Sequence, residues 1–425
     1  MHRDIIFSIS LLFALFAHTA TRAQDSPAAA LLQDKSLAAG NLHPYRAPES
    51  IRDTPPPKGF KPFYISYYGR HGSRYHTGSS KFVPGYGEKL DWLHSEGALS
   101  TEGEKLRSAV KDAYKKHEDR FGDLSDRGFE EGRSIGYRFG KRYPGLFRQK
   151  GRDSIRFRGS PILRSTLTGA AFLSGLQKSH PGIKVNGRSG ERYYFTRWTA
   201  NPRLDKIYKA VSDSVLKADF DSAAFCRRMF TDNDKAAKVF ADKGIARSFR
   251  EMMFILSILP CIDPEADPFA LFTDSETLAY AKTQNIYAAA TFIHTKEGGE
   301  FRDKDAGAPL LRNIVEWADE AIAGNGICAD LRFGHDSGVG PLFSLLYIKG
   351  YDRVSSLVDS FETWPAWDHL FMGSNACFVF YRNSRGEVLV KVLENERETR
   401  IPLLSPYSGP YYRWQDFRDY CIRRI

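Results

Sequence analysis

Cysteine and methionine are scarce in this sequence, with five of each among 425 residues. No two cysteines form a Cys-x-x-Cys pair, which excludes a zinc ribbon and a thioredoxin-like redox site. In an oxidising compartment, one or two disulfides can form and at least one thiol is left over. The spacing does not fix the pairing among Cys226, Cys261, Cys328, Cys377 and Cys421.

Long apolar runs are also absent, since none reaches the roughly 18 residues that span a bilayer. We therefore expect no transmembrane segment. A shorter run from Ile5 to Ala17 follows Arg3 and precedes Thr21-Arg22-Ala23, which places small residues at the −3 and −1 positions of a cleavage site. This pattern is typical of a signal peptide over residues 1–23 and predicts export to the periplasm, the cell surface or the medium. A frayed, cleaved or lipid-tethered start stays open as the alternative.

The sequence contains no internal repeat, no cluster of His, Asp and Glu with metal-ligand spacing, and no RNA-recognition or helix-turn-helix pattern. The net charge is +10, and it becomes +9 when residues 1–23 are removed with Arg3, Arg22 and Asp4. On charge alone, nucleic acids, anionic lipids and phosphorylated metabolites are all open as partners. Because the modules that bind nucleic acid are missing, we expect no nucleic-acid partner, and we expect neither metal nor cofactor. We expect a monomer.

The hydrophobic content of 42% is enough for a large core in one or two domains. Residues 24–60 are rich in Ala, Pro and Asp and predict an extended lead-in. Strand and helix patterns alternate over residues 61–190 and 308–425, whereas residues 191–307 are helical in pattern. This order predicts an α/β fold, in which a sheet core flanked by helices carries an α-helical insertion between its two halves.

Hydrophobic periodicity and capping residues predict the individual elements. Strands are expected at Phe63–Tyr68, Ile155–Arg158 and Ala329–Phe333, and in a hairpin of Ala376–Tyr381 with Glu387–Leu393. Helices are expected from a capping box of Thr101 and Glu104, from Asp126 to about Pro144, from Ser160-Pro161 to Leu176, over Leu310–Ala323, and from Pro341 onward.

The strongest chemical signal is the run Arg70-His71-Gly72-Ser73-Arg74, directly after the first expected strand. Ligands of open α/β sheets bind at the carboxyl ends of strands, so this loop lies where a site is expected. The arginine side chain matches phosphate oxygens with two parallel hydrogen bonds. Two guanidinium groups would also disfavour a protonated imidazole, which leaves His71 neutral and nucleophilic. Arg-His-Gly is a common tripeptide, and taken alone the run favours a solvated basic turn.

Two further motifs also follow strands. Arg164 lies at the start of a helix, where free backbone amides and the helix dipole favour an anion. His335 and Asp336 follow the strand at residues 329–333 and offer an anion ligand and a proton donor. Their alternatives are an ordinary surface arginine and a turn in which Asp336 caps the helix at Pro341.

Together the three motifs resemble the histidine phosphatase superfamily, in its branch of histidine acid phosphatases and phytases. Within that branch the chain is most similar to multiple inositol polyphosphate phosphatases, through residues 142–147 and 389–402 near the C-terminus. The matching residues are Arg70-His71-Gly72-Ser73-Arg74, Arg164 with Thr168-Gly169-Ala170-Ala171-Phe172 and Gly175-Leu176, His335-Asp336, and Asn395-Glu396 with Ile401-Pro402.

The resemblance implies a phosphomonoester hydrolase that works without a metal ion. His71 would form a phosphohistidine, and Asp336 would protonate the leaving alkoxide and then activate water. The phosphate oxygens would be bound by Arg70, Arg74, Arg164 and His335. Because a free aspartic acid titrates near 3.9, we expect an acidic pH optimum.

The chain departs from the family in two places. His76, with Thr77 after it, stands where the family often has proline, and His335-Asp336-Ser337 stands where inositol polyphosphate phosphatases usually have His-Ala-Glu. Inositol hexakisphosphate and its lower esters are the favoured substrates, with Thr77, Lys206 and Lys209 as candidate contacts. A solvated helix face is the alternative for these lysines, and sugar phosphates or other small monoesters are the alternative substrates.

Two other functions compete with hydrolysis. A phosphoglycerate-type mutase shares the Arg-His-Gly loop, but the signal peptide, the long insertion and His335-Asp336 argue against it. From a different class, the chain could be a catalytically inactive polyanion-binding protein on the same scaffold, because a fold alone does not confer activity.

Overall fold

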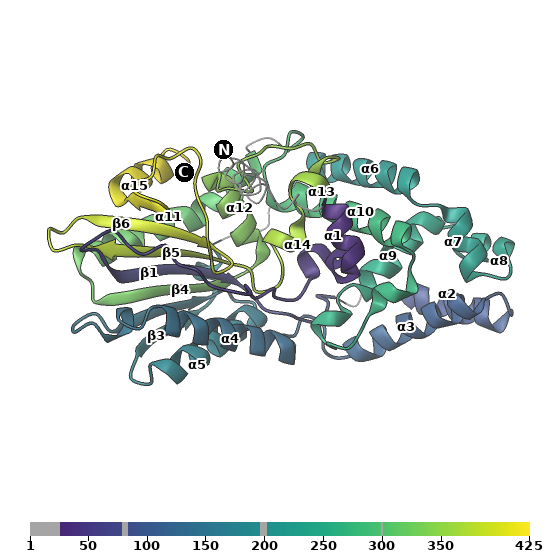
Figure 1. Ribbon diagram of the computed structural model, residues 1–425. Coiled ribbons are helices and arrows are strands. Elements are labelled where there is room, and N and C mark those ends of the chain that lie inside the picture. The colour runs from purple at the N-terminus through teal and green to yellow at the C-terminus, as the bar shows by residue number, and fades with distance from the viewer. Residues whose placement is uncertain (1–25, 79–83, 196–201, 299–300) are drawn as a thin grey trace, which may run out of the picture.

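The computed structural model describes residues 26–78, 84–195, 202–298 and 301–425. Figure 1 shows a sheet with helices on both faces at one end of the molecule and a body of helices at the other. This architecture confirms the predicted α/β class. The strands follow the order β3-β2-β4-β1-β5-β6-β7, with β8 paired to β6. Their bounds are β1 Lys61–Arg70, β2 Ser154–Gly159, β3 Lys184–Ser189, β4 Ile327–Gly334, β5 Asn375–Arg382, β6 Val388–Glu394, β7 Arg397–Glu398 and β8 Tyr411–Arg413.

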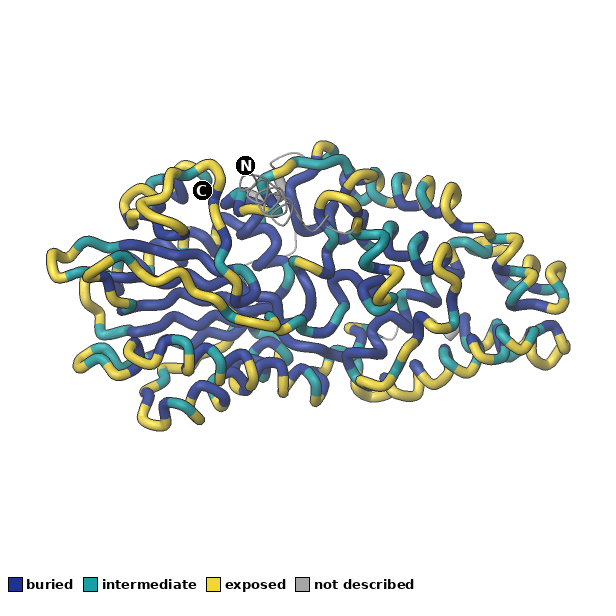
Figure 2. Tube along the Cα trace, viewed as in Figure 1, coloured by how far each residue is buried: buried dark blue, intermediate teal, exposed yellow. Residues whose placement is uncertain are grey.

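The four strands from β3 to β1 are parallel, and the remaining strands are antiparallel. One face of the sheet is covered by α4 (Asp126–Arg142) and α5 (Leu163–Ser179). The other face is covered by α11 (Phe301–Ala323), α12 (Asp336–Leu346) and α15 (Trp414–Ile422). Figure 2 shows the strands buried between these two layers.

Side chains of β1 contribute to both layers of the core, because successive side chains of a strand point to opposite faces. Ile65 and Tyr67 belong to the cluster under α4 and α5, where the rings of Tyr67 and Phe172 lie 5.1 Å apart. Tyr64 and Tyr68 belong to the cluster under α11 and α12. The buried strand expected at residues 63–68 is therefore confirmed, and it extends from Lys61 to Arg70.

The body of helices has its own core, which is separate from the two core layers of the sheet. It contains the predicted insertion, and within residues 202–298 the structure describes no strand beyond isolated bridges. Two segments outside the insertion also belong to it, α2–α3 and the start of the described chain. The helices are α1 Pro27–Gln33, α2 Pro84–Ser95, α3 Thr101–His117, α6 Pro202–Asp219, α7 Ser222–Met229, α8 Asn233–Val239, α9 Ile245–Leu256 and α10 Asp274–Phe292.

The predicted extended lead-in is wrong for its first half. Ser26 caps α1, and a 3-10 helix, η1 (Lys35–Leu42), follows directly. Leu31 and Leu37 are buried in the core of the helical body, which stabilises helical turns in a short segment. The assignment of residues 61–190 to the sheet core also needs correction, because α2 and α3 pack on the insertion. The predicted signal peptide lies outside the described residues.

Several details of the secondary structure differ from the prediction. The helix expected at Pro341 begins five residues earlier, at Asp336, because extended His335 serves as its N-cap and Pro341 is tolerated inside the helix. The cap of α3 is Ser100, whose hydroxyl accepts from Gly103 N at 3.1 Å, and not a Thr101–Glu104 capping box. Strand β3 was not predicted, since its sequence Lys184–Ser189 is polar and only a single apolar residue marks it.

Smaller elements complete the chain. All five thiols are free, and all but Cys226 are buried, so the disulfides considered above are not formed in this structure. None of the helices in the described residues is long and apolar enough to cross a membrane. The remaining helical turns are Leu146–Arg148, Glu191–Tyr193, Leu259–Cys261, Pro268–Leu271, α13 Ser360–Thr363 and α14 Ala366–His369.

Candidate active site

The sheet topology brings the three sequence motifs to one edge. Strands β1 and β4 are parallel neighbours, and Arg70 pairs with Gly334 at their carboxyl ends. Strand β2 pairs with β4 on the other side, and Ser160 N donates to Phe333 O at 2.9 Å. The loops after β1, β2 and β4 therefore meet, which is where open α/β sheets bind ligands.

The backbone of His71 is fixed on both sides. Its N–H donates to Gly334 O at 3.0 Å, and its carbonyl accepts from Gly373 N at 2.9 Å. The ring nitrogen Nδ1 lies 2.9 Å from Gly72 O, and a contact with a carbonyl requires a proton on Nδ1. The lone pair of this imidazole is therefore on Nε2, which is the atom available for nucleophilic attack.

His71 remains neutral in mild acid. Burial lowers its pKa well below the ordinary value, and the positive charges of Arg164, Arg70 and Arg74 lower it further. A protonated imidazole has no lone pair for nucleophilic attack, so this environment favours the form of His71 that could act as a nucleophile. The arginines therefore keep His71 neutral as well as being able to bind an anion.

Three arginines surround the site, and their positive charges outnumber the carboxylates that the described contacts place beside them. Arg70 is buried, donates through Nη1 to Asn41 O at 2.7 Å and forms a 2.8 Å ion pair with Asp336 through Nη2. Arg74 donates to a neighbouring carbonyl at 2.9 Å, and burial, together with Arg164, lowers its pKa to about 9. Burial lowers the pKa of Arg164 as well. Uncompensated buried charge is costly, so this arrangement favours a bound anion.

His335 lies next to His71 in the same site. Its ring lies 5.5 Å from that of His71 between centroids, and its Nε2 lies 3.3 Å from the Ser160 hydroxyl. Its backbone N–H donates to the Tyr68 hydroxyl at 2.9 Å, which fixes the cap of α12. Burial, and next to it the charge of Arg164, lower the pKa of His335 to about 3. A neutral imidazole at this position can still donate a hydrogen bond to a phosphate oxygen.

Asp336 is the only acidic side chain that the described contacts place on the arginine cluster. It opens α12, where its Oδ1 accepts from Ser337 N at 3.0 Å and its Oδ2 accepts from Asn41 Nδ2 at 3.3 Å. Burial raises the pKa of Asp336, but the guanidinium charges of Arg70 and Arg74 outweigh burial and hold it below the ordinary value. Without an anion in the site, Asp336 is therefore a carboxylate.

Two neighbours of the catalytic loop were not identified from the sequence. Asn41, in η1, touches both Arg70 and Asp336, and nothing in a segment expected to be extended signalled this role. Thr168, on α5, accepts from Gly72 N at 3.0 Å and was quoted only as part of the second motif. No three His, Cys, Asp or Glu side chains among the described residues lie close enough together to hold a metal ion.

The candidate substrate contacts are less uniform. Thr77 is exposed, as are Lys206 and Lys209 on α6. Lys209 lines a pocket of about 490 Å³ between α6, α9 and α10, whereas Lys206 is not among its lining residues. Thr77, Lys206 and Lys209 all stay predictions as substrate contacts.

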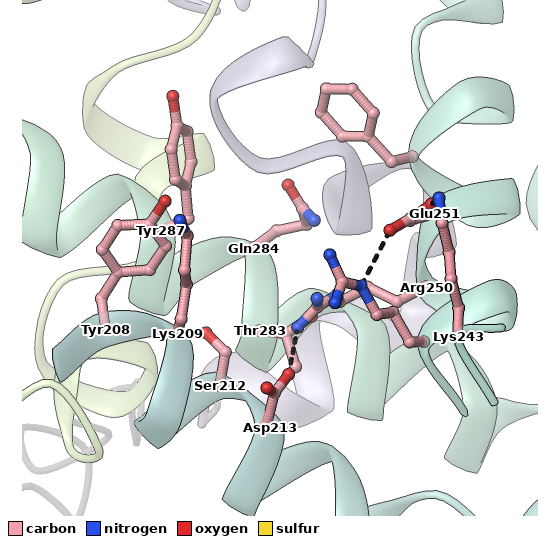
Figure 3. A pocket seen from close by; sticks show the side chains of 12 residues that line it. Tyr208, Lys209, Ser212, Asp213, Lys243, Arg250, Glu251, Thr283, Gln284 and Tyr287 are labelled. Carbon is pink, nitrogen blue, oxygen red and sulfur yellow. Dashed lines mark hydrogen bonds and ion pairs between the residues drawn. The ribbon is translucent and has the colours of Figure 1, made fainter. Parts of the chain in front are cut away.

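This pocket is basic (Figure 3). It contains four cationic side chains and two carboxylates, and ion pairs of 3.1 Å join Arg250 to Asp213 and Arg247 to Glu251. Phe254 connects the pocket to the catalytic loop, since its ring lies 5.0 Å from that of His76. The lining residues are Tyr208, Lys209, Ser212, Asp213, Lys243, Arg247, Arg250, Glu251, Phe254, Thr283, Gln284 and Tyr287.

The fold is shared with solved structures of a multiple inositol polyphosphate phosphatase and a phytase. The chain is similar to the multiple inositol polyphosphate phosphatase of Bifidobacterium longum in its apo form, with a TM-score of 0.73 and 18% identity over 89% of this chain and 96% of that chain. It is also similar to the same enzyme in complex with inositol hexasulfate (TM-score 0.72) and to the phytase from D. castellii (TM-score 0.68, 18% identity, 92% of this chain and 85% of that chain). No family model and no curated protein matches the sequence.

Proposed function

We propose that this chain is a metal-independent phosphomonoester hydrolase that forms a phosphohistidine on His71 and acts on inositol polyphosphates. The observation that carries the proposal is a neutral histidine, with Nε2 as its free atom, among three arginines, of which Arg70 alone forms an ion pair with a carboxylate among the described contacts. Such a site is built for an anion that His71 can attack.

The first step transfers a phosphoryl group from the ester oxygen to His71 Nε2. The P–N bond forms as the P–O bond breaks, while the arginines and His335 stabilise the charge on the other phosphate oxygens. Asp336 donates its proton to the departing alkoxide. In the second step Asp336 takes a proton from water, the water oxygen attacks phosphorus, and His71 is released with inorganic phosphate.

The low pKa of Asp336 in the empty site is compatible with this role. A bound phosphate brings negative charge next to Asp336 and competes for Arg70, and both effects raise the pKa of a carboxyl group. Asp336 therefore takes up a proton when substrate binds. Because this proton comes from solution, kcat/KM falls as pH rises, and the optimum is acidic.

Product analysis with inositol hexakisphosphate tests the proposal. A stepwise series of lower esters with released phosphate is the expected result. Good activity on simple monoesters without release from inositol hexakisphosphate would favour the alternative, a general acid phosphatase. Phosphate migration without release would indicate a mutase, and binding without either reaction would indicate an inactive polyanion-binding protein. Export through residues 1–23 belongs to the same proposal, and sequencing the N-terminus of the mature protein tests it.

Arg164→Ala is expected to raise KM and lower kcat together. Arg164 would bind negative charge that is present in the substrate and grows in the transition state. Its loss should cost about 2–4 kcal/mol of transition-state stabilisation, so kcat/KM should fall roughly 30- to 1000-fold. Steady-state kinetics with p-nitrophenyl phosphate measures this. Arg133→Ala is the matched control, because Arg133 is exposed on α4 and pairs only with Glu130 among its described contacts. An unchanged kcat/KM for Arg164→Ala would show that Arg164 does not bind the phosphate group.

Lys209→Ala is expected to weaken the binding of substrates with several phosphate groups and not the binding of simple monoesters. The pocket behind Lys209 would receive phosphates that are remote from His71, so KM for inositol hexakisphosphate should rise about 5-fold, as for a loss of roughly 1 kcal/mol. The KM for p-nitrophenyl phosphate should not change. Lys217→Ala is the control, because Lys217 is exposed on the same helix and does not line the pocket. Equal changes in KM for both substrates would show that the pocket does not bind the remote phosphate groups.

A further inference from the structure

Ser73 lies between the nucleophile and Arg74, and α4 binds all of its polar groups. Its N–H donates to Glu131 Oε2 at 2.7 Å, and its hydroxyl donates to Glu131 Oε1 at 2.7 Å. Its carbonyl accepts from both the N–H and the hydroxyl of Ser125, each at 3.0 Å. The loop also touches the helix backbone directly, since a Cβ on Gly128 would lie 2.1 Å from Ser73 O. The catalytic loop therefore rests on the first two turns of α4.

The same carboxylate binds a second segment of the chain. Glu131 Oε1 accepts from Tyr45 N at 2.9 Å. The Tyr45 ring packs on Phe371 at 5.5 Å and lies 3.0 Å from the position of a Cβ on Gly373, which has a φ of +72°. Gly373 N is the donor to the carbonyl of His71. Tyr45 thus supports His71 from one side, while Glu131 supports it from the other through Ser73.

The far end of Tyr45 is fixed as well. Its hydroxyl hydrogen-bonds to the carboxylate of Glu396, which also pairs with Arg138 Nη2 at 2.6 Å. Asn395 and Glu396 form the turn between β6 and β7, and both have a positive φ, which is unusual for residues other than glycine. This pair, quoted above only for its resemblance, has a structural role here, and Glu396 is occupied by Arg138 and Tyr45.

Glu131 has no role in the chemistry proposed above, yet its position is costly. It is 9% exposed and accepts three hydrogen bonds, while its one described cationic neighbour, Arg127, is 3.6 Å away. Burial raises its pKa. A buried carboxylate with a distant counter-ion is retained only if its hydrogen bonds compensate for the lost solvation, and here they join two segments around His71.

We propose that Glu131 is a positioning residue that fixes His71 for in-line attack by tying Ser73 to Tyr45. The inference rests on the proposed phosphatase function. Glu131 touches neither substrate nor the reacting atoms, and it acts through the backbone of the catalytic loop. A displacement of the nucleophile by about 1 Å costs on the order of 100-fold in rate.

Glu131→Gln tests this role with little change in volume. The glutamine NH2 group must replace one of the two carboxylate oxygens, and it would then face the N–H of either Ser73 or Tyr45. Two donors would oppose each other, and the loop would shift. We expect kcat for p-nitrophenyl phosphate to fall at least about 30-fold, with KM changed less than about 5-fold. Glu130→Gln is the matched control, because Glu130 is exposed on the same helix and pairs with Arg133; it should behave as wild type.

Two further measurements separate positioning from general stability. Calorimetric titration with inorganic phosphate should show affinity within about 5-fold of wild type, because the phosphate ligands remain. In a double-mutant cycle, Glu131→Gln should cost less in a Ser73→Ala background than alone, since both changes remove the same hydrogen bond. Wild-type kcat in the Glu131→Gln variant, or losses that add in the cycle, would overturn the proposal.

Failure of Glu131→Gln to fold would leave Ser73→Ala as the deciding variant. It removes only the hydroxyl bond, and kcat should fall about 3- to 10-fold without a change in KM. An unchanged kcat for Ser73→Ala would overturn the inference. Wild-type activity keeps the two proposals distinct, because a wild-type protein that releases no phosphate contradicts the phosphatase function itself.

Discussion

Replacement of His71 by alanine is expected to abolish phosphate release, with a loss on the order of 10⁴-fold or more in kcat. Without Nε2 no P–N bond can form, and water has no activated path to the phosphorus atom. No other described side chain combines the same backbone constraints, the same fixed tautomer and a place among the three arginines. His335 is the nearest imidazole, but its Nε2 faces the Ser160 hydroxyl.

Phosphoenzyme trapping measures this prediction directly. Wild-type protein mixed with labelled substrate and quenched in alkali should retain label, because phosphohistidine is labile in acid and stable in base. His71→Ala should retain none, yet it should still bind inorganic phosphate, since the arginines and His335 remain. His94→Ala is the control, because His94 is exposed and pairs with Glu104 on the surface. Retained label in His71→Ala would place the nucleophile elsewhere.

The catalytic residues were accessible from sequence because each motif is local and follows a strand. Arg70, His71 and Arg74 lie within five residues, and His335 adjoins Asp336. Parallel pairing of β1 with β4 then brings two distant loops together without further information. Local patterns were therefore enough to find the residues that we propose to bind phosphate.

The supporting residues were not accessible for the opposite reason. Asn41 reaches Asp336 across 295 positions, and Glu131 reaches Ser73 across 58, so no local pattern records either contact. Asn41 also lies in η1, which Asp34 caps and whose turns are stabilised by packing on the helical body. Long-range packing of this kind overrides propensity, which is why the lead-in was predicted to be extended.

Pro341 shows how a correct local rule can misplace a helix. Proline is common at the first helical position, and this suggested a start at Pro341. Tyr68 fixes the real start, because its hydroxyl accepts from His335 N and its ring fills the space where Gly334 and Gly338 lack side chains. The difference matters for function, since a helix that begins at Asp336 directs its free amides and positive dipole toward the phosphate site.

The activity loss of Asp336→Asn is expected to be larger for substrates with a poor leaving group than for substrates with a good one. An inositol alkoxide needs a proton as the P–O bond breaks, and an amide cannot supply it, so hydrolysis of inositol phosphates should fall by about 100- to 10,000-fold. A p-nitrophenolate leaves without protonation, so its transfer to His71 should be affected much less. The second step loses its base with either substrate, and labelled phosphohistidine should accumulate with the aryl ester.

The proton balance of binding provides an independent test of the same residue. Because Arg70 and Arg74 hold the pKa of Asp336 low in the empty site, binding of sulfate, which carries no proton of its own at pH 5–6, should take up a proton. Titration calorimetry in two buffers of different ionisation enthalpy measures this uptake. Asp336→Asn should reduce it.

Arg70 complicates the substitution, since Asp336→Asn also removes its 2.8 Å ion-pair partner. A purely structural role would therefore lower the melting temperature and reduce activity on both substrates by the same factor, with unchanged proton uptake. Bound phosphate replaces the missing negative charge beside Arg70, so it should restore the melting temperature of Asp336→Asn. It cannot restore proton donation, and an activity loss that persists at saturating inositol hexakisphosphate is therefore the signature of a general acid.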